Sequence, residues 1–330
     1  MARRAVVLMN LGGPDSPASV RPFLYNLFCD PAIIRLPAML RLPLAWGIAA
    51  RRAATARAIY AQLGGASPLL ANTEAQAWAL EAELGAEYRC FIAMRYWHPL
   101  TAAAVGAVKR WQPDEIILLP LYPQFSTTTT ASSLDAWRRE AARQGLVGVT
   151  RAIRSYPAAA GFIAALAALV DGALAEAEAG GLPVRVLFSA HGLPLKIVRA
   201  GDPYADEIET TAEAVVRALG RAALDWLVCY QSRVGPLAWL GPSIEEELRR
   251  AGRDGVAVVV VPISFVSEHS ETLVELDRDY RHLAETCGVP AYHRVPTVGT
   301  DRQFIAGLVE LVRGTGPPAK NATLPPGTGP

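Results

Sequence analysis

Short apolar runs alternate with longer amphipathic stretches along the chain. The runs are rich in valine, isoleucine and leucine and lack polar alternation, which is typical of strands buried on both faces of a parallel sheet. Helical patterns separate the runs, so strand–helix–strand crossovers and an α/β fold are predicted. The predicted strands are residues 5–11, 89–94, 115–121, 147–153, 184–189, 225–230, 256–265 and 291–295.

These strands form two similar sets of four. After the first interval, strand starts within each set are roughly 30 residues apart, as a strand–helix–strand unit requires. The pattern therefore predicts two doubly wound lobes, each with a parallel four-stranded sheet, and a cleft bounded by strand ends.

The first set carries an insertion of apolar residues. Its first interval is longer than that of the second set by on the order of 40 residues, and the surplus falls on segment 21–64. Pro31, Pro37 and Pro43 argue against one long helix there. Two interpretations stay open: a pair of core helices, or an exposed apolar lip with arginine edges, suited to a membrane surface or a large flat ligand. An addition to one copy of a repeat favours the lip.

Acidic residues follow the seventh apolar run at a regular spacing. A helix capped by Ser267 or Ser270 is predicted there. Glu271, Glu275 and Asp279 are four residues apart and would share one helix face. A solvated helix face would show the same pattern. Their position after a buried strand favours a site, because open parallel sheets bind ligands at that edge.

His191 lies in a turn rich in glycine and proline, directly after the predicted strand 184–189. A lone histidine is more often structural, but His191 and Glu271 follow two strands of the same lobe, so a base or a metal site is plausible there. Imidazole and carboxylates without thiolates suit a hard or borderline divalent cation, held loosely. Other polar groups at predicted strand ends are Arg95, Tyr96, Tyr122, Ser126, Gln231, Arg233, Glu268 and His269.

Composition narrows the functional classes. A chain of 330 residues is long enough for two domains, and a net charge of +1 without a basic stripe argues against nucleic acid as a partner. The four cysteines are scattered without a C-x-x-C pair, which suggests a reducing compartment and no zinc knuckle. The apolar start ends at Leu11, too early for a signal peptide, and no membrane-spanning run is evident. A cytoplasmic location is expected.

Several motifs resemble those of the ferrochelatase family, in the same order, over roughly residues 5–313. They are Asn10-Leu-Gly-Gly-Pro14, Arg95-Tyr-Trp-His-Pro-Leu100, Tyr122-Pro-Gln-Phe-Ser126, Ser189-Ala-His-Gly-Leu-Pro194, Gly201-Asp-Pro203, Gln231-Ser-Arg-Val-Gly-Pro-Leu-Ala-Trp-Leu-Gly-Pro242 and Phe265-Val-Ser-Glu-His-Ser-Glu-Thr-Leu-Val-Glu-Leu-Asp277.

The resemblance implies insertion of Fe²⁺ into protoporphyrin IX to give haem b, the last step of haem biosynthesis. It implies two Rossmann-like lobes around a porphyrin cleft. The first would comprise residues 1–155 and 300–313, with the lip insertion at 21–64. The second, residues 156–299, would carry the metal and proton site. The remaining residues, 314–330, are rich in proline and glycine and are predicted to be disordered.

The resemblance also assigns roles to single residues. His191 and Glu271 would be catalytic and would bind the metal. Glu268, His269, Glu275 and Asp279 would form a metal and proton path. Residues 30–52 match the family's hydrophobic lip, which is thought to face the membrane. The implied porphyrin-binding residues are Leu11, Ile33, Ile34, Arg95, Tyr96, Tyr122, Ser126, Trp239 and Phe265.

Departures from animal-type members refine the expectation. Those members carry an iron–sulfur cluster (2Fe–2S) on cysteines, whereas this tail has none and Thr127 stands where they place a ligand. We expect no cluster and no tightly bound cofactor, Fe²⁺ being a substrate, with peripheral contact at the inner-membrane surface. With its ordinary pKa of about 6.5, His191 is predicted to be a neutral base at cell pH. The alternatives are a chelatase for coproporphyrin or another tetrapyrrole or metal, and a non-catalytic porphyrin carrier.

Overall fold

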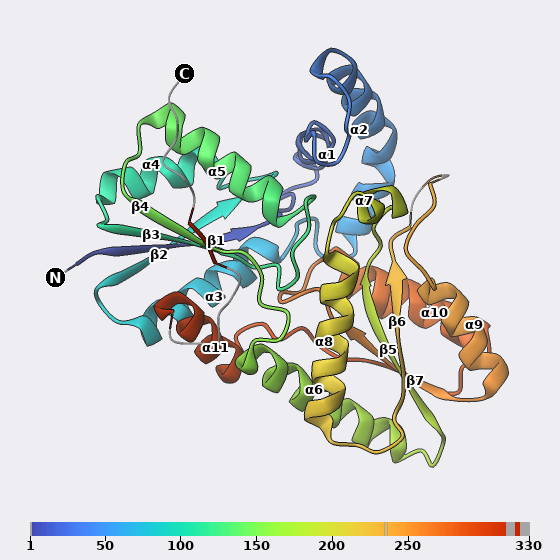
Figure 1. Cartoon of the computed structure of the whole chain (residues 1–330). Coiled ribbons are helices and arrows are strands. Elements are labelled where there is room, and N and C mark those ends of the chain that lie inside the picture. The colour runs from blue at the N-terminus through green and yellow to red at the C-terminus, as the bar shows by residue number, and fades with distance from the viewer. Residues whose placement is uncertain (1, 234, 236, 315–320, 324–330) are drawn as a thin grey trace. The chain divides into compact units, whose positions relative to one another are not determined.

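A computed structural model describes residues 2–233, 235 and 237–314, and the backbone of 321–323. The chain divides into two compact units, Met1–Tyr156 with Leu308–Pro330, and Pro157–Gly307 (Figure 1). The sequence placed the boundaries at 155 and 300. The second boundary lies instead inside helix α11 (Arg302–Arg313), so that this helix contributes to both units.

The first unit contains four parallel strands in the order β2-β1-β3-β4. Their apolar side chains are buried on both faces of the sheet, as the uninterrupted runs predicted. A short strand, β9, pairs antiparallel with β4 at the edge. It lies in the tail predicted to be disordered, and residues 315–320 and 324–330 of that tail are outside the described part of the chain. The strands are β1 (Arg4–Asn10), β2 (Tyr88–Met94), β3 (Glu115–Pro120), β4 (Val149–Ile153) and β9 (Asn321–Thr323).

Helices cover both faces of this sheet (Figure 1). Helices α4 (Thr101–Trp111) and α5 (Thr130–Gln144) pack Val105, Val108 and Trp137 against the strands on one face. Helix α3 (Leu69–Leu84) lies on the other face, where Thr73 accepts a hydrogen bond from Asn10 at the end of β1.

The apolar segment folds as two helices, α1 (Val20–Phe28) and α2 (Ala38–Ala61). Phe23 and Leu24 of α1 pack against Ala49 of α2 in a small core. Prolines were predicted to interrupt the segment, but α2 continues through Pro43. This part of α2 is exposed, so the carbonyl group that loses its helical partner can bond to water instead.

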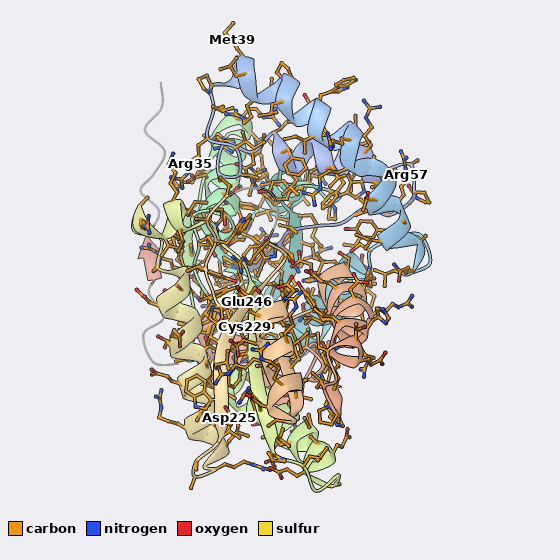
Figure 2. All side chains as sticks on the ribbon, turned by 90° about the vertical axis from the view of Figure 1, so that its right-hand side faces the viewer. Arg35, Met39, Arg57, Asp225, Cys229 and Glu246 are labelled. Atoms are coloured by element: carbon orange, nitrogen blue, oxygen red, sulfur yellow. The ribbon has the colours of Figure 1, made fainter. Side chains whose placement is uncertain are left out.

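The outward face of α2 is apolar and unpacked. Met39 lies at its outer end with a side chain 88% exposed, and Arg57 lies near its other end (Figure 2). Leu40 and Trp46 are more than half exposed. Both interpretations of the segment are therefore partly correct: α1 and one side of α2 form core, while the start of α2 is an exposed apolar surface.

The second unit contains a parallel sheet in the order β6-β5-β7-β8. Helices α6 and α8 lie on one face and α9 and α10 on the other (Figure 1). The two sheets and their flanking helices confirm the predicted α/β fold. The elements are α6 (Ala160–Glu178), β5 (Val184–His191), α7 (Leu195–Arg199), α8 (Tyr204–Leu219), β6 (Asp225–Gln231), α9 (Ile244–Asp254), β7 (Ala257–Pro262), the π-helix η1 (Glu271–Asp279), α10 (Tyr280–Thr286) and β8 (Tyr292–Arg294).

Local sequence explains two of these helices. Ser243 and Glu246 form a reciprocal capping box at the start of α9, worth about 1 kcal/mol (Figure 2 labels Glu246). Helix α6 is long and apolar enough to cross a membrane by length and composition alone. Phe162, Leu166 and Val170 are buried within the unit, so α6 fits the alternative of a core helix, which passes the same test.

Candidate active site

The carboxyl ends of three neighbouring strands in the second unit meet at one edge of its sheet. His191 is the last residue of β5 and is paired in register with Gln231, the last residue of β6. Ser189 pairs with Pro262 at the end of β7. The segment that follows β7 leads into η1, which returns Glu271 to His191. Because parallel strands end at the same edge, residues far apart in sequence converge there.

His191 and Glu271 are in direct contact. The imidazole Nδ1 lies 2.8 Å from the Glu271 carboxylate oxygen Oε2. The two side chains are 44% and 30% exposed, so the pair is accessible to solvent on one side. The predicted convergence of these two residues is correct.

Each member of the pair changes the pKa of the other. Burial lowers the pKa of His191, but the charge and hydrogen bond of Glu271, aided by Glu275, outweigh burial and raise it to about 9. Burial raises the pKa of Glu271, but His191 outweighs this effect and lowers it to about 2. Both pKa shifts favour an imidazolium–carboxylate ion pair at neutral pH, whereas the ordinary pKa of histidine predicted a neutral His191.

Glu271 begins a π-helix, not the α-helix that its spacing predicted. The Tyr280 amide donates to the carbonyl oxygen of Glu275, five residues earlier, as π geometry requires. Ser270, one of the two predicted caps, makes no side-chain capping bond at η1. The His269 Nδ1 atom instead accepts the Glu271 amide at 3.0 Å. Burial outweighs the opposing charge of Glu271 and lowers the pKa of His269, so its ring is the neutral neighbour of the charged pair.

Glu275 fixes the chain that follows β6. Its carboxylate accepts hydrogen bonds from the amide and hydroxyl of Ser232, at 3.0 and 2.6 Å, and from Gln231 Nε2 at 3.3 Å. The Tyr280 hydroxyl lies 3.0 Å from the same carboxylate. Burial and the charge of Glu271 raise the pKa of Glu275. The two carboxylates are thus adjacent, and Glu275 takes up a proton more readily than Glu271.

The remaining predicted path residues lie in different surroundings. Asp279 is exposed at the end of η1. The Glu268 carboxylate accepts hydrogen bonds from Arg294 Nη1 at 2.6 Å and from the Thr297 amide at 2.9 Å. The structure therefore brings Glu271 and Glu275 together, places Asp279 towards solvent, and engages Glu268 in an ion pair.

The predicted apolar walls lie close to the pair in sequence and space. The Phe265 ring meets the His269 ring edge-on, with centroids 4.4 Å apart. Gly192, directly after His191, allows the partly buried Trp239 to approach, because an added Cβ atom would lie 2.8 Å from the Gln231 carbonyl oxygen and 3.3 Å from the Trp239 ring.

In the first unit, the predicted residues Arg95 and Tyr96 are held by a buried carboxylate. Asp30 Oδ2 accepts hydrogen bonds from Arg95 Nη2 and the Tyr96 hydroxyl, both at 2.7 Å, and from the Ser132 hydroxyl. Burial raises the pKa of Asp30, but these donors and the Ala32 amide outweigh it, so the net pKa is lowered. Asp30 is the first residue of the lip, so it joins the lip to the end of β2.

The predicted porphyrin-binding residues of this unit differ in their exposure to solvent. Tyr96 is 1% and Ser126 2% exposed, so neither side chain presents a surface to solvent. Leu11, Ile33, Ile34, Arg95 and Tyr122 are partly exposed.

Sequence reasoning did not single out Asp30, Ser232 or Arg294. Asp30 and Ser232 contact residues far away in the sequence, so only the folded chain reveals these contacts. Asp30 nevertheless precedes a proline at the start of the apolar segment, which was a usable signal. No group of three histidine, cysteine, aspartate or glutamate side chains among the described residues forms a closed metal site. The open arrangement of His191 and Glu271 suits a cation in passage.

Comparison with known proteins identifies similar sequences over nearly the whole chain. The sequence model of the family Ferrochelatase matches residues 3–315. A ferrochelatase of Caulobacter vibrioides is 54% identical over 316 residues, which cover 94% of this chain and 89% of that protein. A ferrochelatase of Wolbachia sp. subsp. Drosophila simulans is 51% identical over 313 residues, covering 94% of this chain and 98% of the relative.

Solved structures share the fold. The sirohydrochlorin chelatase SirB from Bacillus subtilis subspecies spizizenii, in complex with cobalt, superposes with a TM-score of 0.54 at 12% identity and covers 96% of each chain. DR2241 from Deinococcus radiodurans, described as similar to chelatases, gives a TM-score of 0.53 at 16% identity, over 97% of this chain and 57% of that one. At these identities the likeness concerns the fold alone.

Proposed function

This chain belongs to the ferrochelatase family, and from that membership we propose that its substrates are protoporphyrin IX and Fe²⁺. It is an enzyme that inserts a metal ion into a porphyrin, the last step of haem synthesis. The observation that carries the proposal is the contact of 2.8 Å between His191 and Glu271, which joins an imidazole to a carboxylate at a partly open edge.

Metal insertion needs two proton transfers. The pyrrole nitrogens lose two protons while a dication binds the same ring, so the charge of the ring complex does not change. A base near the ring accepts the pyrrole protons, and an oxygen or nitrogen ligand delivers Fe²⁺ to the ring nitrogens. His191 and Glu271 provide these groups.

The ion pair of the free enzyme explains how the base becomes available. A dication at Glu271 cancels the negative charge that raises the pKa of His191. Only the charge of Glu275 then opposes burial, so the pKa of His191 falls and the imidazolium releases its proton. Glu275, adjacent and with a raised pKa, takes up this proton more readily than Glu271. Iron thereby converts His191 into the neutral base that accepts one pyrrole proton, and His191 accepts the second after it has passed the first to solvent at its exposed side.

Glu275→Gln and Asp279→Asn should weaken metal delivery more than porphyrin binding. Each change removes one negative charge from the approach to Glu271 while retaining the size of the side chain. We expect the KM for Fe²⁺ to rise by about tenfold, equivalent to about 1.4 kcal/mol, with the porphyrin Kd unchanged. Anaerobic initial rates and fluorescence quenching of porphyrin measure the two constants. Glu285→Gln, an exposed carboxylate of α10, is the control. Equal changes in both constants would rule out a metal path.

A substrate competition tests the proposed function. The protein is mixed anaerobically with Fe²⁺ and equal amounts of protoporphyrin IX and coproporphyrin, and products are separated and quantified by absorbance. Preferential formation of protohaem supports the proposal. Preferential metalation of coproporphyrin would show that coproporphyrin, and not protoporphyrin IX, is the substrate. Binding of porphyrin without metalation would identify a carrier.

We further propose that the lip contacts the surface of an anionic membrane from the cytoplasmic side. Met39, Leu40 and Trp46 offer an exposed apolar surface. Residues 31–73 contain five arginines and no acidic residue. Each arginine near an anionic leaflet contributes about 1 kcal/mol of binding free energy, which complements the insertion of apolar side chains.

Charges placed on this apolar surface should prevent membrane binding. Met39→Glu with Leu40→Glu should weaken binding to phosphatidylglycerol-containing vesicles by more than about tenfold, since burying each side chain is worth about 1.5–3 kcal/mol. Vesicle cosedimentation measures the loss. Trp78→Glu, at a 71% exposed site on α3, is the control. Unchanged binding of the double variant would contradict the proposal.

We also propose that the chain holds no tightly bound cofactor. Its four free cysteines are divided between the units, Cys29 and Cys90 in the first and Cys229 and Cys287 in the second. Iron determination on the purified protein tests this proposal, and a stoichiometry of two irons per chain would contradict it.

A further inference from the structure

Arg294 forms ion pairs with the segment that carries Glu271, one before Glu271 and one after it. Its Nη1 atom donates to Glu268 Oε1 at 2.6 Å, three residues before Glu271. Its Nε and Nη2 atoms donate to the two oxygens of Asp277, at 2.8 and 2.6 Å, six residues after Glu271. The Arg294 side chain is 10% exposed, and those of Glu268 and Asp277 are 23% and 26% exposed.

Strand β8 fixes the backbone position of Arg294. Arg294 is the last residue of β8, and β8 pairs with β7, which leads into the segment 268–277. Thr297, three residues further, donates its amide to the same Glu268 oxygen. Tyr292, two residues earlier, donates its hydroxyl to the Leu276 carbonyl at 2.7 Å. Residues of the short edge strand β8 and of the chain just after it therefore hold both Glu268, which precedes η1, and Leu276 and Asp277 within η1.

A π-helix needs such anchors more than an α-helix does. Its geometry is rare and occurs mostly as short segments at functional sites. Glu268, Glu271, Glu275 and Asp277 also place four carboxylates within ten residues, which repel one another unless a cation is held among them. Arg294 supplies the fixed cation and the bidentate geometry on Asp277.

We propose that Arg294 is a positioning residue that holds the segment 268–277 in its π-helical form, with Glu271 in contact with His191. Arginine is required because its planar fork contacts both carboxylates at once, whereas the single ammonium group of lysine cannot reproduce the fork. Without Arg294 the segment rewinds towards an α-helix, and the Glu271 carboxylate leaves His191. This inference rests on the proposed function only for its effect on the rate.

The chain contains a matched control for this arginine. Arg185, in the same unit, is 7% exposed and also bridges two carboxylates, Asp225 at 2.8 Å and Asp254 at 2.9 Å. It lies six residues before His191 along β5, about 20 Å from the site by strand geometry. Arg185→Lys should therefore reduce stability as much as Arg294→Lys does, but should leave the site unchanged.

The test compares both lysine variants in three measurements on the full chain. For Arg294→Lys we expect kcat to fall by about 10- to 100-fold, as for misplacement of a reacting group by about 1 Å. We expect an unchanged Kd for protoporphyrin IX, and faster amide exchange confined to peptides covering 268–279. Arg185→Lys should retain its kcat and its exchange at 268–279. In Arg294→Ala, added methylguanidinium should restore at least part of the lost kcat.

Two outcomes would overturn the proposal. One is wild-type kcat and unchanged exchange at 268–279 in Arg294→Lys. The other is an equal loss of kcat in Arg185→Lys, which would make the effect one of general stability. Failure of the proposed function has a different signature: the wild-type protein does not insert Fe²⁺ into protoporphyrin IX, while exchange at 268–279 still depends on Arg294.

Discussion

His191→Ala should reduce the rate of metal insertion by about 10²- to 10⁴-fold, the range for loss of a positioned general base. The variant removes both the proton acceptor and the partner that holds Glu271 ionised. Protoporphyrin binding should persist within about twofold, because the walls formed by Trp239 and Phe265 are untouched. Single-turnover metalation under anaerobic conditions, followed in the visible spectrum, measures the rate.

His282→Ala provides the control for this experiment. His282 is 83% exposed on α10 in the same unit, and its loss should leave the rate unchanged. A His191→Ala variant that inserts metal at close to the wild-type rate would contradict the assigned role. Loss of porphyrin binding together with the rate would instead make His191 a residue of the porphyrin pocket.

Glu271→Gln should reduce kcat by about 10²-fold or more and should lower the pKa of His191 from about 9 to its ordinary value or below. The amide keeps the size of the side chain but removes the charge that opposes burial. His191 would then be a neutral base without its metal ligand, so a faster proton transfer cannot restore the rate. Carbon-13 or nitrogen-15 NMR of the labelled histidines measures the pKa.

The wild-type pair also predicts how stability depends on pH. The folded pKa of His191 lies above the ordinary value of 6.5, so its contribution is present below about 6.5 and is lost as the pH rises through about 9. The folded pKa of Glu271 lies below 4.5, so its contribution is present above about 4.5 and is lost as the pH falls towards 2. Urea titrations at several pH values should show that Glu271→Gln reduces the pH dependence of the free energy of unfolding at both the acidic and the basic end. A variant with the wild-type pH dependence would show that the ion pair does not form.

The sequence was sufficient for the architecture and for the central pair. Uninterrupted apolar runs have one good solution, a strand buried on both faces, and the repeat of four such runs defined the two sheets. His191 and Glu271 could be brought together because parallel strands end at a common edge. The parallel direction of the strands was enough for this inference, and the alternation of strands and helices predicts that direction.

Features that depend on tertiary contacts could not be predicted in the same way. The spacing of Glu271 and Glu275 fits an α-helix, and the π form depends on partners such as Arg294 and Tyr292 from another strand. The charge of His191 depends on its distance from Glu271, which no reference pKa contains. Tyr96 was predicted at a porphyrin surface; its ring is buried in the small core with Phe23 and Leu24, and its hydroxyl group bonds to Asp30, 66 residues earlier in the chain.

The Asp30 network has an evolutionary consequence. It attaches the lip to the sheet through one buried carboxylate, while the side chains of Met39 and Leu40 have no polar atom and are exposed. Substitutions at such exposed positions usually change stability by less than about 0.5 kcal/mol, whereas loss of a buried charge partner costs several-fold more. The outward face of α2 can therefore diversify between lineages with little effect on stability, whereas substitution of Asp30 would destabilise the fold.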